Sequence, residues 1–141
     1  MGLDQYASTV SKRGQKLREQ MLQLPTNQDR KAFWEENRGE DEVDTIQTWR
    51  KHANLNEWMT QLAVRKGVVK DAIEFNCVDL LLNADDIADL EATVLSDEMP
   101  VGGGFFWGKS FPEDKQLDLD FIEKAKRAMD AGQQVIYSCW W

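Results

Sequence analysis

The segment 102–110, GGGFFWGKS, has the residue spacing of a phosphate-binding loop. Gly103, four further residues, and then Gly108, Lys109 and Ser110 satisfy that pattern. In such a loop, consecutive backbone N–H groups surround a phosphate, and the following helix directs its positive end at it. The pattern raises nucleotide binding as one hypothesis, with the Lys109 side chain on the phosphates.

The residues on either side of this segment do not supply the architecture of such a loop. Residues 96–100 (SDEMP) make a poor strand, and residues 105–107 are large aromatics, which favour a strand over a tight anion-binding turn. Glu113 and Asp114 follow closely, and their negative charges oppose a triphosphate. We interpret the glycines as a turn into a short aromatic strand, 104–107. A nucleotide or another small ligand stays the alternative occupant.

His52 is the only histidine in the sequence, so any catalysis that uses a histidine as general base would have to use this residue. It could pair with a nucleophilic Cys77 or Cys139, although nothing in the spacing demands it. One histidine and two distant cysteines match no zinc spacing. We interpret both cysteines as buried thiols of a protein from a reducing compartment. The sequence predicts no catalytic residue, no metal and no cofactor, and favours a protein that is not an enzyme.

The negative charge is concentrated in one segment. Residues 71–98 contain nine acidic residues and no Lys or Arg, whereas the rest of the chain is nearly neutral and the whole carries −8. Such a field repels nucleic acid and attracts basic partners. Asp85, Asp86 and Asp89 could bind a hard cation, but helix capping and the helix dipole explain them more simply. The predicted acidic surface consists of Asp79, Asp85, Asp86, Asp89 and Glu91.

Aromatic residues supply the remaining candidates, since six tryptophans in 141 residues is a high count. Tryptophans left exposed by a fold are frequent binding anchors, and packing in the core is the alternative for each. The candidate ligand- or partner-binding residues are Trp49, Arg50, Lys51, Trp58, Phe106, Trp107, Lys109, Tyr137 and Trp140.

Periodicity and turn residues predict the elements that would position these side chains. Expected strands are 2–9, 72–78, 104–107 and 134–140, and expected helices are 13–24, 28–37, 44–66, 84–96 and 118–131. This order predicts an α+β fold as a single domain over 1–141, with a small, mainly antiparallel sheet packed against several helices. No apolar run approaches the roughly 18 residues that span a bilayer. We expect a cytoplasmic protein without membrane contact.

Four short motifs connect the chain to a known family. They are the start MGLD with Tyr6 close behind, WRKHANLNEWM at 49–59, GGFFWG at 103–108, and YSCWW at 137–141. On these motifs the chain resembles a family of small uncharacterised bacteriophage and prophage proteins. It departs from that family at Asn56, where histidine is frequent, and at Met59, where phenylalanine is frequent.

The resemblance implies a phage setting and the host cytoplasm, and it carries over no catalytic residues. The expected function is that of a non-enzymatic accessory protein that binds a basic host protein and no nucleic acid. A nucleotide or small-ligand binder using the 102–110 segment is the alternative, and a virion component is a third hypothesis. The oligomeric state does not follow from the sequence.

Overall fold

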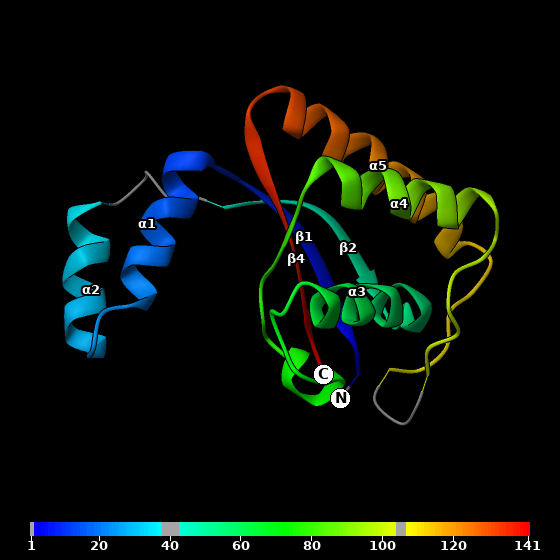
Figure 1. The fold of residues 1–141 in the computed structure, drawn as a ribbon, viewed down its shortest axis with the longest axis horizontal. Helices are drawn as coiled ribbons and strands as arrows, with labels where there is room; N and C mark the ends of the chain where they lie inside the picture. The colour runs from blue at the N-terminus through cyan, green and yellow to red at the C-terminus, as the bar shows by residue number, and fades with distance from the viewer. Residues whose placement is uncertain (1, 38–42, 104–106) are drawn as a thin grey trace.

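The computed structural model describes residues 2–37, 43–103 and 107–141, and Figure 1 shows its arrangement. The elements in chain order are β1 (Asp4–Ser11), α1 (Lys12–Leu22), α2 (Asn27–Glu36), β2 (Asp44–Arg50), α3 (Ala53–Arg65), the 3₁₀ helix η1 (Ala72–Phe75), β3 (Leu80–Leu82), α4 (Ala84–Leu95), α5 (Asp114–Asp130) and β4 (Gln133–Trp140). The predicted α+β class is confirmed.

The four strands form one sheet in the order β2-β1-β4-β3, and every pairing is antiparallel. Alternate residues point to opposite faces of such a sheet. One face, which includes Leu3, Ala7 and Tyr137, lies in the core beneath α3, α4 and α5. The other face includes Tyr6 and Trp140, which are exposed. The sheet therefore has one well-covered face.

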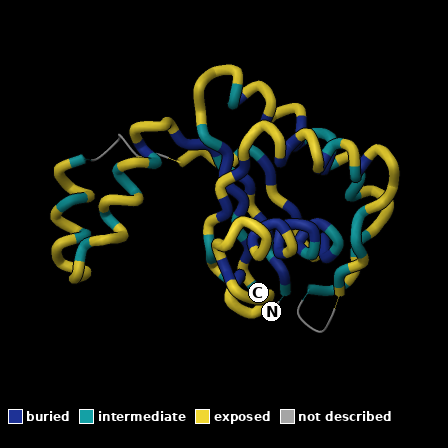
Figure 2. Tube along the Cα trace, viewed as in Figure 1, coloured by how far each residue is buried: buried dark blue, intermediate teal, exposed yellow. Residues whose placement is uncertain are grey.

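The core is built from the covered sheet face and the apolar stripes of three helices, and it forms the dark interior in Figure 2. Trp49 of β2 meets Phe121 of α5 edge to face, with ring centroids 5.2 Å apart. Phe75 stacks on Tyr137 at 6.1 Å. Lys124 of α5 donates to the carbonyl oxygen of Ile46 at 3.0 Å, so it covers part of the edge strand β2.

The prediction of one helix over 44–66 is wrong, because the segment divides into β2 and α3. Lys51 adopts a positive φ of 57°, which turns the chain between the two elements. Residues 44–50 include β-branched Thr45, Ile46 and Thr48, which favour a strand, and they pair with β1. The helical spacing of Ile46 and Trp49 misled the prediction because short apolar runs fit both periods.

Two further boundaries differ from the prediction. Residues 72–78 form no strand, because the Asp71 carboxylate accepts the N–H groups of Ile73 and Glu74 and starts the 3₁₀ helix η1. The short strand β3 follows instead. Helix α5 begins at Asp114, earlier than the expected 118, and the expected strand 104–107 lies largely outside the described residues.

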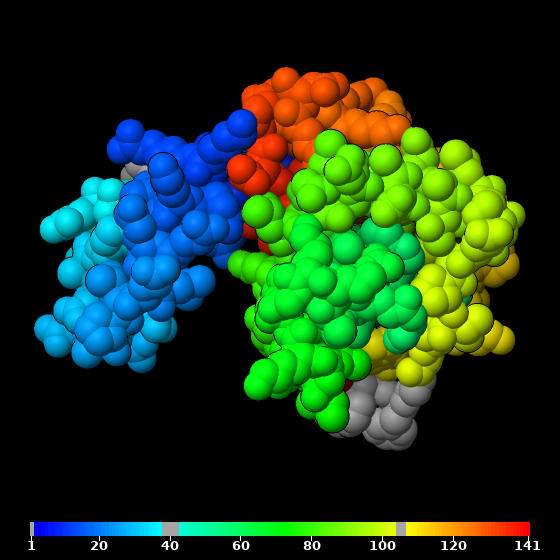
Figure 3. Space-filling view, viewed as in Figure 1, coloured from blue at the N-terminus to red at the C-terminus, as the bar shows by residue number. Residues whose placement is uncertain are grey.

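Helices α1 and α2 form a hairpin that projects from the rest of the molecule (Figures 1 and 3). In the space-filling view of Figure 3, a gap separates much of this hairpin from the remaining chain. We call residues 12–36 the hairpin and the rest of the described chain the body. Within the described residues, no helix combines the length and the apolar character that crossing a membrane requires.

Candidate functional site

His52 lies in the tight turn between β2 and α3, where the protein holds its backbone from two sides. The buried side chain of Gln5 accepts the His52 N–H at 2.9 Å and donates to the His52 carbonyl at 3.1 Å. Lys51, directly before it, has the left-handed backbone that L-residues rarely adopt. The imidazole is therefore fixed at the beginning of α3, and His52 as a whole is only 3% exposed.

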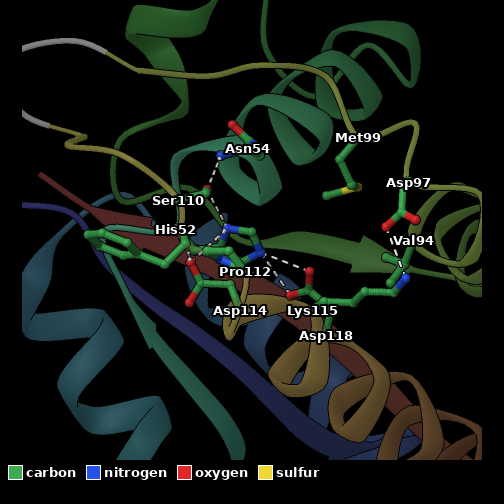
Figure 4. A pocket seen from close by; sticks show the side chains of 11 residues that line it. His52, Asn54, Val94, Asp97, Met99, Ser110, Pro112, Asp114, Lys115 and Asp118 are labelled. Atoms are coloured by element: carbon green, nitrogen blue, oxygen red, sulfur yellow. Dashed lines mark hydrogen bonds and ion pairs between the residues drawn. The ribbon is translucent and has the colours of Figure 1, made fainter.

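The imidazole connects a serine and an aspartate from two distant parts of the chain (Figure 4). Its Nδ1 lies 2.7 Å from Ser110 Oγ, and its Nε2 lies 2.8 Å from Asp118 Oδ2. A second carboxylate, that of Asp114, stands 3.7 Å from Nδ1. Ser110, His52 and Asp118 thus form a serine–histidine–aspartate array.

The hydrogen-bond partners favour one arrangement of the protons in this array when Asp118 is ionised. Ser110 Oγ accepts the backbone N–H of Asn54 at 2.9 Å, which leaves its own proton to donate to His52 Nδ1. With Asp118 ionised, the other imidazole nitrogen carries its proton toward the carboxylate. The nitrogen facing Ser110 then has a free lone pair and is placed to accept the hydroxyl proton.

Burial raises the pKa of Asp118 above its ordinary value; the hydrogen bond to His52, and the charge of that ring when it is protonated, oppose the rise without cancelling it. The second carboxylate nearby, Asp114, raises it further by repulsion. Burial thus makes the charged form of Asp118 costly, and its hydrogen bond to the imidazole offsets part of that cost.

The array lies at one wall of an open cavity of about 390 Å³. The cavity is lined by side chains from α3, the end of α4, the loop after it and the start of α5: His52, Asn54, Val94, Asp97, Met99, Ser110, Phe111, Pro112, Asp114, Lys115 and Asp118. Lys115 is paired with Asp97 at 2.9 Å on its rim, as Figure 4 shows. The remaining carboxylates leave the cavity with an excess of negative charge.

Two glycines bring the 102–110 segment against α3. A side chain at Gly102 would place its Cβ 2.2 Å from the Ala53 carbonyl oxygen, so only glycine fits this approach. The Gly102 N–H also donates to Asn54 Oδ1 at 3.0 Å. Gly108 has a φ of 75°, which favours glycine. Gly102, directly before the phosphate-loop pattern, and Gly108 within it therefore bring Ser110 to the beginning of α3.

The described part of this segment lacks the strand–loop–helix order of a phosphate loop. It follows an irregular stretch after α4, and α5 begins only at Asp114. Lys109 is exposed, whereas Ser110 points to His52. Phe106 lies outside the described residues. Of this predicted ligand-binding segment, the structure brings Ser110 to a cavity and leaves Lys109 at the surface.

The predicted aromatic anchors divide between core and surface. Trp49, Trp58 and Tyr137 are 3%, 7% and 0% exposed and pack in the core. Trp107 is half-buried against Trp141, and Trp140 is 60% exposed on the open sheet face. Arg50 ends the edge strand β2 and Lys51 lies in the turn after it; both are exposed, and neither lines the cavity.

The predicted acidic surface is partly neutralised within the chain. Asp79 pairs with Arg18 at 2.7 Å, Asp86 with Lys66 at 2.5 Å, and Glu91 with Lys126 at 2.7 Å. Asp86 also caps α4, as the capping interpretation expected. Asp85 and Asp89 are exposed on α4 without a partner in the described residues.

The two cysteines differ in their surroundings. Cys139 is buried as expected, and burial raises the pKa of its thiol to about 12, so its thiolate is scarce near neutral pH. The expectation of a buried Cys77 is wrong, because its segment is a surface turn with a positive φ of 63°. No group of three or more metal-ligating side chains occurs in the described ranges.

Sequence reasoning missed Ser110, Asp114 and Asp118 as partners of His52. They lie 58 to 66 positions away in the chain, and no local motif contains them together with the histidine. Two features of the sequence could have pointed to them. A single histidine requires hydrogen-bond partners from elsewhere in the chain, and Ser110 is the last residue of the phosphate-loop pattern in 102–110.

Comparison with protein-family models, with curated proteins and with solved structures found no match to this chain.

Proposed function

We propose that the chain is a small serine-dependent hydrolase that cleaves acyl compounds in the His52 cavity. The observation that carries the proposal is the unbroken hydrogen-bonded array from Ser110 through His52 to Asp118 at the wall of that cavity. Arrays of this kind are recognised by geometry and roles, because they recur on unrelated folds in different chain orders. Here the two imidazole nitrogens have exchanged their usual partners.

Ser110 is the nucleophile and His52 the general base in this proposal. Ser110 Oγ attacks the carbonyl carbon of an ester while its proton moves to His52 Nδ1. The bond from that carbon to the leaving oxygen breaks, and the leaving alcohol takes the proton from Nδ1. A water molecule then attacks the acyl carbon and gives a proton to Nδ1. The acid departs as Ser110 regains its proton, so one ester and one water yield one acid and one alcohol.

Asp118 acts through the imidazole as a positioning residue. Its carboxylate favours the tautomer that carries the proton on Nε2, so that the lone pair of Nδ1 faces Ser110. The carboxylate also stabilises the imidazolium that forms during the attack. The Asn54 N–H at the beginning of α3 donates to Ser110 Oγ, so the positive end of the α3 dipole favours the negative charge that this oxygen gains as its proton moves to His52.

The charge of the cavity indicates the class of substrate. Three carboxylates, those of Asp97, Asp114 and Asp118, outnumber the single lysine, and that lysine is already paired. Anionic acyl compounds are repelled by such a site, whereas neutral or cationic esters are accepted. Val94, Met99 and Phe111 provide apolar wall for a short acyl chain.

The function expected from the sequence, binding of a basic host protein, has weaker support in the geometry. Three of its five acidic residues are engaged in ion pairs within the chain. Of its aromatic anchors, only Trp140 is strongly exposed among those described. The pocket has convergent side chains from four parts of the chain, so the hydrolytic proposal takes precedence.

A fluorophosphonate probe tests the proposal directly, because it forms a stable bond only with an activated serine and releases fluoride. We expect the intact protein to gain one adduct on Ser110, measured by mass spectrometry, and the adduct to be absent in Ser110→Ala. His52→Gln is expected to slow labelling by at least about a hundredfold, since it removes the general base. Ser138→Ala, a serine on the open sheet face, is the matched control and keeps the wild-type rate.

Two results would contradict the proposal. One is a folded wild-type protein that acquires no adduct during prolonged exposure to the probe. The other is an adduct that forms equally well in Ser110→Ala, which would place the reactivity elsewhere in the chain. Hydrolysis of a neutral p-nitrophenyl ester, compared between the same variants, then separates labelling from turnover.

A further inference from the structure

The hairpin leaves its apolar residues without a core. Helix α2 contains no buried residue, and α1 buries only Gly14. Leu22 is 59% exposed and Trp34 42% exposed, and Phe33 is only half-buried. Isolated helices of ten or eleven residues are marginal in water, because their stability comes from packing of an apolar face. The hairpin therefore needs a cover that the described residues of one chain do not provide.

A groove between α1 and the sheet offers the place for that cover. It consists of two adjoining cavities of about 500 and 580 Å³, which share Lys12, Leu81 and Gln134 as lining residues. Lys16 lines the second of them. Leu81 is 38% exposed there, so the floor of the groove is partly apolar. Arg13 and Glu19 also line the second cavity, so the groove combines an excess of cationic side chains with a partly apolar floor.

Four charges at the body end of the hairpin have no ion-pair partner in the described chain. Lys12 and Lys16 lie in the first turns of α1, and Glu35 and Glu36 lie in the last turn of α2. Each sign is the opposite of what its own helix dipole favours, since anions suit a helix N-terminus and cations a C-terminus. These charges complement each other, and α2 matches the groove in both charge and apolar content.

We propose that two copies of this chain interlock their hairpins, with α2 of each copy filling the groove between α1 and the sheet of the other. A two-fold axis along the hairpins places α1, α2, α1 and α2 at the corners of a four-helix bundle. Every α2 then contacts both copies of α1 and the partner's sheet, and its exposed tryptophan is covered. Glu35 and Glu36 of one copy come beside the groove that holds Lys12 and Lys16 of the other.

Self-complementarity is what selects a second copy as the occupant. An isologous interface uses the same surface on both subunits, so each needed group must be present in the chain itself. Here the donor helix, the receiving groove and both signs of charge belong to one chain. An unrelated partner would use the groove but leave α2 uncovered.

Sedimentation velocity and light scattering on the full chain test the proposal. We expect a concentration-dependent dimer, and Trp34→Glu is expected to shift it to monomer. Trp140→Glu, at the other strongly exposed tryptophan, is the matched control and is expected to leave the dimer intact. The double variant Lys12→Glu with Lys16→Glu should weaken dimerisation at least about tenfold, because each lost pair costs a fraction of a kcal/mol and the interface contains two sets.

Adding Glu35→Lys and Glu36→Lys to that double variant reverses both signs and is expected to restore the dimer. A chain that stays monomeric from about 1 μM to about 1 mM would overturn the proposal, because that range covers ordinary homodimer affinities. So would a dimer that is indifferent to both Trp34→Glu and the charge exchange. Far-UV circular dichroism verifies that each variant keeps its helices.

Discussion

Helix α3 in the body buries eight of its 13 residues, whereas α2 in the hairpin buries none of its ten. The two helices also begin differently. Helix α2 has its own cap, since Thr26 accepts the Asp29 N–H at 3.0 Å, and α1 is capped in the same way by Ser11. Helix α3 has no side-chain cap of its own and relies on Ser110, which comes from another part of the chain.

This difference separates two ways of specifying a helix. The hairpin is specified by local signals, which are the helix caps and the proline between the helices. Packing within one chain adds little to its stability. The body is specified by long-range contacts, and α3, for example, lacks a helix cap from its own N-terminal residues. The same long-range contacts assemble the candidate site, because the residue that caps α3 is also the proposed nucleophile.

The largest expected difference between the body and the hairpin is in the unfolding free energy lost when a buried side chain of the body is truncated. Phe121 is fully buried against Trp49, so Phe121→Ala leaves a cavity and should cost about 3–5 kcal/mol of unfolding free energy. Trp34→Ala, measured where the chain is monomeric, should change it by less than about 0.5 kcal/mol. Urea denaturation of both variants gives the two numbers. Similar losses at the two positions would show that the hairpin is packed as tightly as the body.

A second prediction concerns the contact between the glycine segment and α3. Gly102→Ala forces a Cβ into the Ala53 carbonyl oxygen, and overpacking of this kind costs about 1–3 kcal/mol. Because the same contact positions Ser110, labelling by the fluorophosphonate probe should fall as well. Gly103→Ala is the matched control, since among the described residues its Cβ would meet the Gly108 carbonyl oxygen alone, at an ordinary contact distance of 3.6 Å.

The control should unfold within about 0.5 kcal/mol of the wild type and keep its reactivity. If Gly102→Ala proves as harmless as Gly103→Ala in urea denaturation and in labelling, the segment does not hold Ser110 in place.

The elements with local signals are those that the sequence predicted. Helices 13–24 and 28–37, the capped helix after Asn83 and the last strand agree with α1, α2, α4 and β4 to within a few residues. The split of 44–66 could not be predicted, because β2 exists through its pairing with β1 and the turn at Lys51 satisfies long-range contacts. Tertiary context overrides periodicity in such segments.

The candidate site was the least predictable part for the same reason. Its residues come from the β2–α3 turn, the glycine segment and α5, and only the fold brings them together. The motif in the sequence pointed to the correct segment but to the wrong chemistry. A phosphate loop uses Lys109 and backbone N–H groups, whereas the geometry presents the adjacent Ser110 to a histidine.

The smallest predicted effect lies where the two regions meet. Arg18 of α1 pairs with Asp79 of the body at 2.7 Å, and both side chains retain solvent contact. Exposed pairs of this kind contribute at most about 1 kcal/mol, so Arg18→Ala should change global stability by less than Gly102→Ala does. Its effect should appear instead as faster amide hydrogen exchange in 12–36, while exchange in α5 stays unchanged.

Raising the salt concentration of the wild type should reproduce part of that change, because solvent-exposed charges are screened. If exchange in the hairpin is the same with and without Arg18, the ion pair does not orient it. The packing of α1 against β1 and β4 would then be the remaining attachment. Either result measures how rigidly the body holds the hairpin before it pairs with a second copy. That rigidity matters because the hairpin buries almost no residues within one chain and is specified mainly by its own helix caps.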